Sequence, residues 1–518
     1  MSRTGPWGPL DAVLAGAADD HPDRDAVTDG EQGLTYRELE TRVRELAARL
    51  RAAGVRPGHR VGVYVPKGTD ALVAVYAALR CGAVAAPLDV KVPAERTARM
   101  AVNAALGFLV TTDRTAASAL RVGEFTGQGP GEAGALVPGL GLLPLRPPGP
   151  PPAEGGDGGY LLFTSGSTGW PKGVLLSHEN VLHFARWTVD QFGLKFSDRV
   201  GSQASLTFDL STFDIFGSAL SGACLVLLPE PLKAFPQDVV NWLRTERVSA
   251  FYAVPTLYQA LLHQGGIGTA PLPDLRVIAF AGEPFPVGDL EKYRSLFEAA
   301  EFYNLYGPTE TNVCTFERVP PGWSASDGLS IGKEIAGVRV ELVDDDHRVT
   351  SDAGEIAVSG PTVALGYLEN GRHRPLTSPI HLADGRTRPA YLTGDLGHYG
   401  EDGRIHLRGR RDHQIKRRGH RIDLQDIESV VQEFPSVRTC AAVWAPDGAT
   451  GGELRLHVAA DGATERQLRE QLSAVLPRHM LPDRIHLAER LPLTERGKVD
   501  REALASAEPT RERGHEER

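Results

Sequence analysis

Apolar residues recur with helical spacing near the start of the chain. Residues 34–39 open this helix and Gly54 ends it. Its apolar face consists of Leu39, Val43, Leu46, Ala47 and Leu50. Because positions three and four residues apart share one side of a helix, the pattern predicts an amphipathic helix packed on a core.

The next hydrophobic runs alternate in length. Residues 61–65 and 83–88 are short apolar runs that predict buried strands, and residues 70–81 between them predict a buried helix. The alternation resumes from residue 199 to about residue 319. Strands that alternate with helices favour an α/β fold with a largely parallel sheet.

The last third of the chain has a different pattern. Residues 331–367 predict short strands joined by turns, and a boundary falls near residues 409–412. A compact α+β module is expected beyond it. Its predicted elements are a helix from Asp426, strands at 439–444 and 454–459, and a helix from Thr464.

Two segments are poor in core-forming residues. Residues 127–159 are rich in Gly and Pro and predict a surface loop, with residues 146–159 mobile. The highly charged end of the chain predicts a disordered tail over residues 506–518.

Composition and charge exclude several classes of protein. The chain has 518 residues, 41% hydrophobic and 24% charged, with a net charge of -10, so no basic field favours nucleic acid. The four cysteines are far apart and fit neither a zinc site nor a disulfide framework. No run reaches the ~18 apolar residues that a membrane span needs, and no signal peptide is visible. We therefore expect a protein of the reducing cytoplasm.

Residues 164–173 combine three glycines, four hydroxyl side chains and Lys172 directly after an apolar run. This composition suits a loop that wraps a polyphosphate with backbone N–H groups, hydroxyls and one cation. It is not a Walker loop, because Pro171 stands where that pattern requires glycine. A flexible surface turn explains the loop equally well when it is taken alone.

Six further segments follow in order along the chain. They are residues 208–211, 304–310, 354–368, 391–395, 409–419 and 493–501. Together with the loop they resemble the adenylate-forming superfamily, and within it the amino-acid adenylation domains of nonribosomal peptide synthetases. The resemblance covers roughly residues 34–501. It implies a large N-terminal domain of αβ sheets with a distorted β-barrel, and a small mobile α+β C-terminal domain.

The resemblance also implies domain limits. The core adenylation domain would span residues 1–409, residues 410 and 411 would approach a hinge at Asp412, and residues 412–505 would form the C-terminal lid.

The resemblance assigns nucleotide contacts to the motifs. The loop and Lys172 would cradle the β- and γ-phosphates of ATP, Glu310 would hold Mg²⁺, and Asp395 would accept both ribose hydroxyls. The full expected ATP-binding set is Thr164, Ser165, Gly166, Ser167, Thr168, Gly169, Lys172, Asn304, Tyr306, Gly307, Thr309, Asp395 and Arg410. Taken alone, Glu310 fits a helix start and Asp395 fits a turn cap.

Lys498 carries the chemistry in this interpretation, although an isolated lysine in a Gly-flanked loop is most often a surface residue. By resemblance it bridges the substrate carboxylate and the α-phosphate during adenylation. The lid then rotates about Asp412, and the segment from Lys416 to Gly419 lines a thiol channel. One lysine cannot serve both steps from one position, so a hinge is mechanistically sensible.

Asp209 decides the substrate class. By resemblance it accepts the α-ammonium group of an amino acid, and a buried carboxylate without a cation is costly. A strand-end aspartate bonded to backbone is the alternative. The other pocket positions carried over are Leu210, Phe213, Tyr252, Ala279, Ala281, Leu305, Val313 and Cys314.

This lining is apolar and disfavours charged or amide side chains. The set looks most like free-standing L-prolyl–carrier-protein ligases of pyrrole-forming antibiotic pathways, so L-proline is the first choice. Alanine, another small apolar residue or an aryl glycine remain alternatives.

The expected second step is transfer to a phosphopantetheine thiol. No carrier module follows residue 501, so we expect a separate carrier protein, with a small activating partner protein as a further requirement in some relatives. A cluster of basic residues at 408–421 offers a docking surface for an acidic carrier helix. Coenzyme A as acceptor, and a catalytically silent ATP-binding protein, are the competing hypotheses.

Overall fold

The computed structural model describes most of the chain. The described residues are 8–30, 32–126, 134–145, 158–164, 171–269, 271–411, 414–445, 452–492 and 499–506. They cluster into two compact units. The larger holds the described residues up to 411 together with 416–420, and the smaller holds residues 414, 415 and 421–506. The short segment 416–420 thus groups with the larger unit rather than with the expected lid. No helix in the described ranges has the length and apolarity to cross a membrane.

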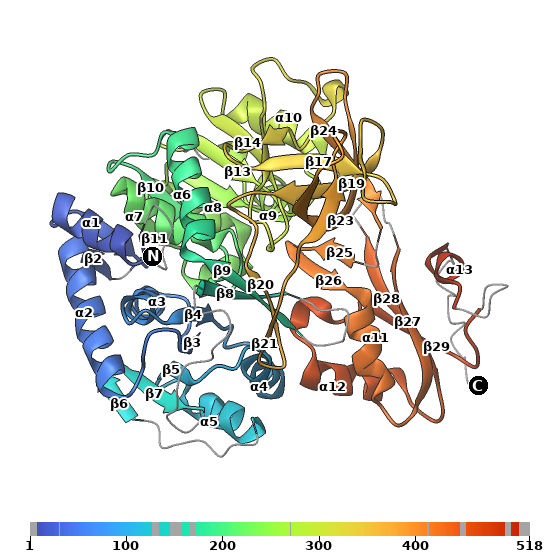
Figure 1. Ribbon diagram of the computed structural model, residues 1–518, viewed down its shortest axis with the longest axis horizontal. Coiled ribbons are helices and arrows are strands. Elements are labelled where there is room, and N and C mark those ends of the chain that lie inside the picture. The colour runs from blue at the N-terminus through green and yellow to red at the C-terminus, as the bar shows by residue number, and fades with distance from the viewer. Residues whose placement is uncertain are drawn as a thin grey trace. The chain divides into compact units, whose positions relative to one another are not determined.

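A nine-stranded sheet organises the first part of the larger unit (Figure 1). Its order is β21 (Arg372–Arg374), β20 (Gly366–Glu369), β9 (Lys172–Ser177), β8 (Gly158–Thr164), β4 (Val84–Pro87), β3 (Arg60–Tyr64), β5 (Phe108–Thr112), β7 (Leu140–Pro144) and β6 (Gly134–Val137). The central strands β8, β4, β3 and β5 run parallel, as the alternating pattern predicts. Their carboxyl ends therefore share one edge of the sheet, where β8 runs into the candidate phosphate loop.

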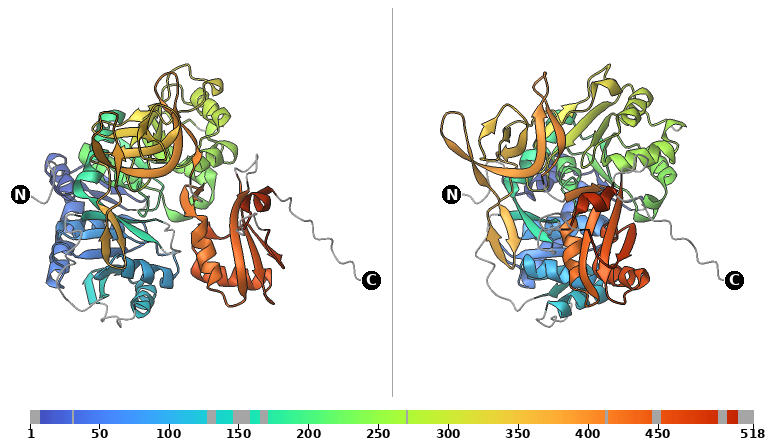
Figure 2. Two further views of the ribbon diagram at one scale, coloured as in Figure 1. Left: turned by 45° about the vertical axis from the view of Figure 1, so that its right-hand side comes forward. Right: turned by 90° about the vertical axis from the view of Figure 1, so that its right-hand side faces the viewer.

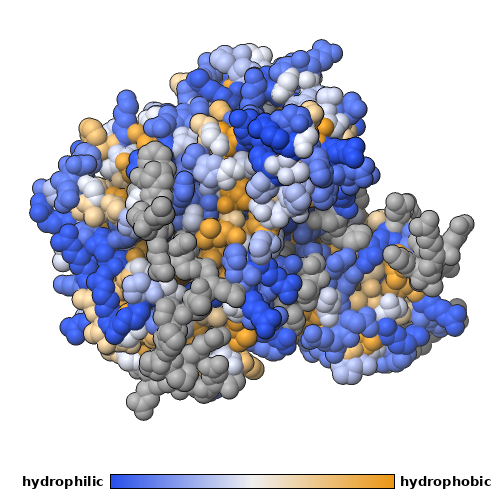
Figure 3. All heavy atoms as spheres, viewed as in Figure 1, coloured by the Kyte–Doolittle hydropathy of each residue, from blue (hydrophilic) through white to orange (hydrophobic). Residues whose placement is uncertain are grey.

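Helices cover both faces of this sheet because successive strand residues point to opposite sides. Val61 and Val63 of β3 pack with α2 (Tyr36–Ala52) and α3 (Thr69–Arg80), whereas Leu109 of β5 packs with α4 (Ala94–Asn103) and α5 (Ala116–Phe125). The predicted apolar face of α2 is buried, and its charged side lies at the hydrophilic left edge of the face seen in Figure 3. The helix begins at a capping box formed by Thr35 and Glu38.

The prediction of a surface loop over residues 127–159 is wrong for residues 134–145. Residues 134–145 form the hairpin of β6 and β7, and β7 pairs with β5 inside the sheet. Leu140, Leu142 and Leu143 are buried there. Leu140 and Leu142 occupy alternate strand positions, so they point to the same buried face and favour a strand despite the glycine between them. Residues 146–157 lie outside the described residues.

A second nine-stranded sheet carries most of the candidate site. Its order is β16 (Lys333–Glu334), β15 (Thr315–Arg318), β14 (Glu301–Tyr306), β13 (Val277–Phe280), β12 (Ala250–Ala253), β10 (Arg199–Ser202), β11 (Cys224–Leu227), β1 (Asp25–Thr28) and β2 (Gly33–Thr35). The strands from β14 to β1 are parallel.

The second sheet is also covered on two sides. One face packs on α8 (Pro236–Thr245), α9 (Pro255–His263) and α10 (Val287–Leu296). The other packs on α6 (His178–Phe192) and on a π-helical turn, η1 (Phe213–Gly217). The short helices α1 (Ala12–Asp20) and α7 (Ser218–Ser221) pack against each other, and α7 contacts β11 (Figure 1).

An antiparallel sheet completes the larger unit. It contains β18 (Val349–Thr350), β17 (Arg339–Val343), β19 (Gly354–Ser359), β23 (Thr387–Tyr399), β22 (Ser378–His381) and β24 (Ile405–Arg410). The first three of these strands correspond to the short strands predicted for residues 331–367. Short 3₁₀ turns at Glu230–Ala234, Ile267–Thr269 and Ala325–Asp327 connect other elements of the unit.

The smaller unit is the expected α+β module. Its sheet consists of β27 (Val437–Ala445), β28 (Glu453–Ala460) and β29 (Arg484–Ala488), and a 3₁₀ turn at Arg478–Met480 precedes the last strand. Helices α11 (Leu424–Gln432) and α12 (Glu465–Val475) pack on one face, and α13 (Arg501–Ser506) lies on the other (Figure 2). Strands β25 (Gln414–Arg417) and β26 (His420–Asp423) form a separate two-stranded ribbon.

All four cysteines are free and buried. Burial raises the pKa of the Cys224, Cys314 and Cys440 thiols to about 12, and it raises that of Cys81 as well.

Candidate active site

Lys172 stands where the phosphate loop returns to the sheet. Thr164, the last residue of β8, pairs with Lys172, the first residue of β9. The Lys172 ammonium lies 3.2 Å from the Glu369 carboxylate and 5.4 Å from the centre of the Tyr367 ring. The loop residues Ser165, Gly166, Ser167, Thr168 and Gly169 lie outside the described residues.

Tyr367 links this lysine to the candidate magnesium ligand. Its hydroxyl donates a hydrogen bond of 2.8 Å to Oε1 of Glu310, whose side chain is 1% exposed. Burial and the neighbouring Glu310 charge raise the pKa of Tyr367, so the phenol stays a donor. Tyr367 therefore contacts the Lys172 ammonium with the face of its ring and the Glu310 carboxylate with its hydroxyl.

The donor set can be tested against Mg²⁺. Among the described residues no group of three or more His, Cys, Asp or Glu side chains is arranged to hold a metal ion. Mg²⁺ in nucleotide enzymes commonly takes one or two carboxylates and completes its shell with phosphate oxygens and water. A single oriented carboxylate at Glu310 fits that kind of site and does not fit an all-protein metal cage.

Asp395 is held by two of the predicted nucleotide residues. Tyr306 donates a hydrogen bond of 2.7 Å to Oδ2, and Arg410 forms an ion pair of 2.5 Å with Oδ1. Arg410 also donates to the carbonyl of Thr393. Both oxygens are thus engaged before any ribose arrives, so ribose hydroxyls would share them. Asn304, on the same strand as Tyr306, donates instead to the carbonyl of Ser330 at 2.6 Å.

The turn after Tyr306 explains why Gly307 belongs to the motif. A Cβ at this position would lie 1.7 Å from the carbonyl oxygen of Asn312, so only glycine fits. Asn312 adopts a left-handed conformation and donates 3.0 Å to the Thr212 hydroxyl. The turn that follows Tyr306 is therefore joined to the segment that carries Asp209.

Asp209 lies against this turn. Its Oδ2 accepts a hydrogen bond of 2.9 Å from the Thr309 hydroxyl, and its Oδ1 accepts one of 2.8 Å from the Leu210 N–H. Thr309, expected at the nucleotide, thus faces Asp209, the residue expected to bind the substrate ammonium. The pKa of Asp209 is raised, and burial is the largest cause. The Glu310 charge raises this pKa further, whereas the two hydrogen bonds and the Lys416 charge lower it in part. Asp209 does accept a hydrogen bond from the backbone, as the alternative interpretation predicts. This bond supplies no positive charge to balance the carboxylate.

An apolar wall adjoins Asp209. A single hydrophobic cluster contains Leu210, Phe213, Tyr252, Ala279, Leu305, Val313 and Cys314, with Ala281 packed against it. Tyr252 and Ala279 are register partners on neighbouring parallel strands, and the Phe213 and Tyr252 rings meet edge to face with centroids 5.9 Å apart. All predicted apolar pocket residues therefore gather in one place, although they come from five separate segments.

The segment at residues 416–420 contributes further groups to the larger unit. The Lys416 ammonium lies 5.6 Å from the centre of the Tyr306 ring. Gly419, with φ of 79°, donates 2.5 Å to Glu283, and His420 meets the Phe208 ring at 4.8 Å. The predicted hinge Asp412 and the predicted catalytic Lys498 both lie outside the described residues.

Sequence reasoning did not assign roles to Tyr367 or Glu283. Tyr367 stands inside a family motif, between Gly366 and Leu368. The motif marks the position but does not indicate that its hydroxyl would bind Glu310. Glu283 follows a buried strand and caps the start of α9 by accepting hydrogen bonds from Thr256. Nothing in its local sequence distinguishes it from a surface glutamate.

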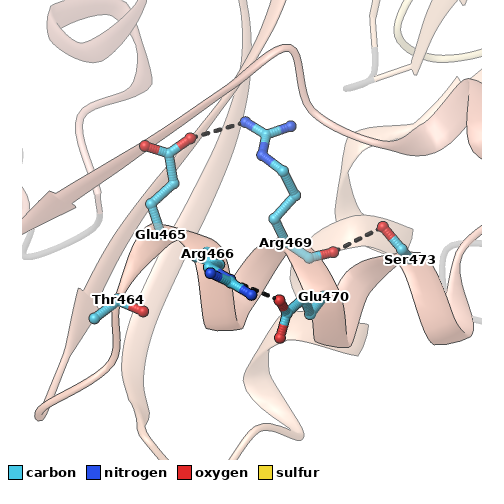
Figure 4. Close-up of a pocket in the computed structure, with 6 residues that line it drawn as sticks. All are labelled: Thr464, Glu465, Arg466, Arg469, Glu470 and Ser473. Carbon is cyan, nitrogen blue, oxygen red and sulfur yellow. Dashed lines mark hydrogen bonds and ion pairs between the residues drawn. The ribbon is translucent and has the colours of Figure 1, made fainter.

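The smaller unit has a hollow of about 750 Å³ on α12 (Figure 4). It is lined by Thr464, Glu465, Arg466, Arg469, Glu470 and Ser473. Its charges neutralise one another, with Glu465–Arg469 and Arg466–Glu470 ion pairs of 2.9 Å each. Such paired charges along one exposed helix are typical of a solvated surface.

Comparison with known proteins agrees with this arrangement. An L-proline–[L-prolyl-carrier protein] ligase of Pseudomonas fluorescens is 33% identical over 512 residues, covering 94% of this chain and 96% of its own. A ligase of the same name from Streptomyces coelicolor is 34% identical over 516 residues, covering 93% of each chain.

Solved structures share the whole architecture. An NRPS protein containing adenylation and PCP domains superposes with a TM-score of 0.78 at 26% identity, covering 96% of this chain and 84% of that one. The amide bond synthetase McbA from Marinactinospora thermotolerans has a TM-score of 0.80 at 24% identity, covering 96% and 99%, and shows the fold alone. These neighbours confirm the expected α/β class with a large and a small domain.

Family models account for both parts of the chain. The model of the AMP-binding enzyme matches residues 14–368, and that of the AMP-binding enzyme C-terminal domain matches residues 426–498. The first match alone spans more than half of the sequence and includes Lys172, Asp209 and Glu310. The chain belongs to the AMP-binding enzyme family.

Proposed function

We propose that this protein activates an amino acid with ATP and transfers it to the phosphopantetheine thiol of a separate carrier protein, with L-proline as the substrate. The observation that carries the proposal is Asp209, a carboxylate of raised pKa at the border of an apolar wall. A cationic amine bound there would supply the missing opposite charge, and the apolar wall would receive a side chain without polar groups. The two relatives named as L-proline ligases support the choice of substrate.

The first reaction joins two anions. A carboxylate oxygen of the amino acid attacks the α-phosphorus of ATP, and the bond to pyrophosphate breaks. Lys172 and the loop before it would hold the β- and γ-phosphates, and Lys498 would neutralise charge between the carboxylate and the α-phosphate. Glu310, oriented by Tyr367, would hold Mg²⁺, which supplies further neutralisation of the phosphates when bound.

The second reaction consumes the mixed anhydride. The thiol sulfur attacks the aminoacyl carbonyl, AMP leaves, and a thioester forms. Because Lys498 would occupy the site during the first step, a rotation about Asp412 would exchange it for the segment from Lys416 to Gly419. The position of the Lys416 ammonium beside the Tyr306 ring, and its charge effect on Asp209, support this proposed role.

Amino-acid-dependent exchange of pyrophosphate into ATP tests the proposal. Proline, alanine, aryl glycines and amine-free analogues of each form the panel. We expect the strongest exchange with L-proline and none with amine-free acids. Preference for alanine or an aryl glycine would keep the reaction and replace the substrate, whereas no exchange with any acid would favour a silent ATP-binding protein.

The acceptor needs its own experiment. Incubation with ATP, the preferred amino acid and either a holo-carrier protein or coenzyme A would reveal the thioester by mass. We expect the mass of the carrier to increase and coenzyme A to remain unmodified. Dependence on an added small activating protein, domain limits at 409 and 412, and a cytoplasmic location stay predictions.

A further inference from the structure

Asp214 is a buried acid that the proposed reaction does not use. It follows Phe213 on the π-helical turn η1, its side chain is 0% exposed, and among the described residues neither carboxylate oxygen has a hydrogen-bond partner. A buried polar group without a partner destabilises the fold by several kcal/mol when it is charged. Burial raises the pKa of Asp214, while the Lys67 charge opposes the rise, and so does the nearby Ser202 hydroxyl, which itself has no hydrogen-bond partner among the described residues.

Lys67 is the cation that faces this acid. It stands between β3 and α3 in the first sheet, yet its ammonium donates to the carbonyls of Ser202, at 2.8 Å, and Ala204, at 2.5 Å. Ser202 ends β10 of the second sheet, and Ala204 lies on the chain that continues to Asp209. Lys67 therefore fastens the beginning of the substrate-binding segment to the neighbouring sheet.

The two charges act on one another without direct contact. Lys67 and Asp214, both described, form no ion pair, but each shifts the pKa of the other. Burial and the Lys233 charge lower the pKa of Lys67, and the Asp214 and Glu230 charges oppose this. Lys67 binds the start of residues 202–214 and Asp214 is its last residue, and this stretch holds Asp209, Leu210 and Phe213. Between these ends the chain has no regular strand or α-helix.

The charge of Asp214 also acts on Tyr252, a residue of the apolar wall. Burial raises the pKa of Tyr252, and the charges of Asp209 and Asp214 raise it further. The ring of Tyr252 therefore lies within electrostatic range of both acids. The π-helical turn that carries Asp214 is a conformation found frequently at functional sites.

A small cavity adjoins Lys67. It measures about 120 Å³ and is lined in part by Lys67 and by Ser205, Leu206 and Thr207, the residues directly before Phe208. Its other charged residues, Asp89, Lys91, Glu230 and Lys233, lie around it, and Glu230 pairs with both Lys91 and Lys233. A volume of this size holds a few water molecules at about 30 Å³ each, so the segment has room to shift.

We propose that Lys67 and Asp214 are a buried electrostatic pair that positions residues 205–213 and thereby sets the affinity for the amino acid. The proposal rests on the proposed function, because it concerns the pocket at Asp209. Lys67 and Asp214 are positioning residues that do not touch the substrate. Loss of either charge leaves the other uncompensated, and the segment between them relaxes toward the cavity.

A double-mutant cycle tests the pair. Lys67→Met and Asp214→Asn each raise the KM for the amino acid by about tenfold, and the double variant recovers most of the loss, because the remaining uncompensated charge is gone. The KM for ATP stays within about twofold of the parent in all three, since the nucleotide residues are elsewhere. Lys67→Arg keeps the charge and retains most of the affinity. Lys292→Met, an exposed lysine on α10 that pairs with Asp289, is the control and changes neither KM.

If the increases in KM for the amino acid are additive in the double variant, Lys67 and Asp214 do not act as a pair. Equal changes in the KM for the amino acid and the KM for ATP would also refute the proposal. Thermal unfolding of the same variants separates this result from a failure of the proposed function. If the parent activates no amino acid, the proposed function fails, and the unfolding cycle still decides the pair: a double variant more stable than Lys67→Met supports coupling, and strictly additive shifts in Tm refute it.

Discussion

Replacing Asp209 with asparagine separates the substrate charge from the packing of the site. Asparagine has nearly the same shape, and its amide oxygen can still accept from the Leu210 N–H or from the Thr309 hydroxyl. What Asp209→Asn removes is the negative charge that would face the α-ammonium of the amino acid.

The magnitude follows from the burial of this carboxylate. A hydrogen bond to a charged group contributes about 1.5–3 kcal/mol, so kcat/KM for the amino acid should fall roughly 10- to 150-fold. The KM for ATP should not change, because Asp395, Arg410 and Glu310 are untouched. The raised pKa also predicts that kcat/KM for the amino acid in the parent falls as pH decreases through it, and that this dependence is lost in the variant.

Stability should move in the opposite direction. The folded-state pKa of Asp209 lies above the ordinary value for aspartate, so folding disfavours its charged form and the charge destabilises the free protein at neutral pH. Asp209→Asn should therefore raise Tm at pH 7 while it lowers activity, and the gain should shrink as pH falls and Asp209 protonates. Pyrophosphate exchange and calorimetry on the same preparation provide both measurements.

Two outcomes would refute the reasoning. An unchanged KM for the amino acid would mean that no ammonium binds at Asp209. A lower Tm at neutral pH would mean that the carboxylate is already compensated inside the protein. Thr309→Val is the matched control, because it removes one hydrogen bond to Asp209 while keeping the charge, and it should have the smaller effect on KM.

Three other predictions concern separate parts of the molecule. Tyr367→Phe removes the hydroxyl that orients Glu310 and should lower kcat/KM for MgATP roughly 10- to 100-fold, with no effect on the KM for the amino acid; equal kinetics would contradict the assignment. Thr35→Ala breaks the capping box with Glu38 and should cost about 1 kcal/mol in urea unfolding, with activity unchanged at 25 °C. Burial lowers the pKa of His457 to about 4, so its neutral form stabilises the smaller unit above the ordinary pKa, and that stability should be lost progressively as pH falls from about 6.5 toward 4, by at most about 3 kcal/mol. In His457→Phe this part of the pH dependence of unfolding should be absent.

The sequence predicted the elements whose pattern is local. The helix carrying Leu39 and Val43 and the strand at 61–65 have strong periodicity, and their structure follows from it. The hairpin at 134–145 was missed because glycine and proline around it obscured a short alternation of leucines. A sheet register depends on the partner strand, and β7 finds its partner in β5 through contacts that composition does not encode.

The same distinction applies to the candidate site. Motifs identified Asp209, Glu310 and Asp395 as residues with a chemical role. Their partners come from distant segments, so the hydrogen bond from Thr309 to Asp209 and that from Tyr367 to Glu310 appear only once the chain is folded. Asp214 was not predicted at all, because a single acid after a pocket residue has no distinguishing pattern, and its burial decides its importance.

The four buried cysteines have a consequence for an enzyme that handles a reactive anhydride. An accessible thiolate would compete with the intended acceptor for the aminoacyl group, or would trap the phosphopantetheine arm as a mixed disulfide. Here every cysteine is buried and its thiol is held in the protonated form at neutral pH. The protein is thereby protected from self-acylation at cysteine, and a cysteine introduced on its surface would be the single reactive thiol for labelling.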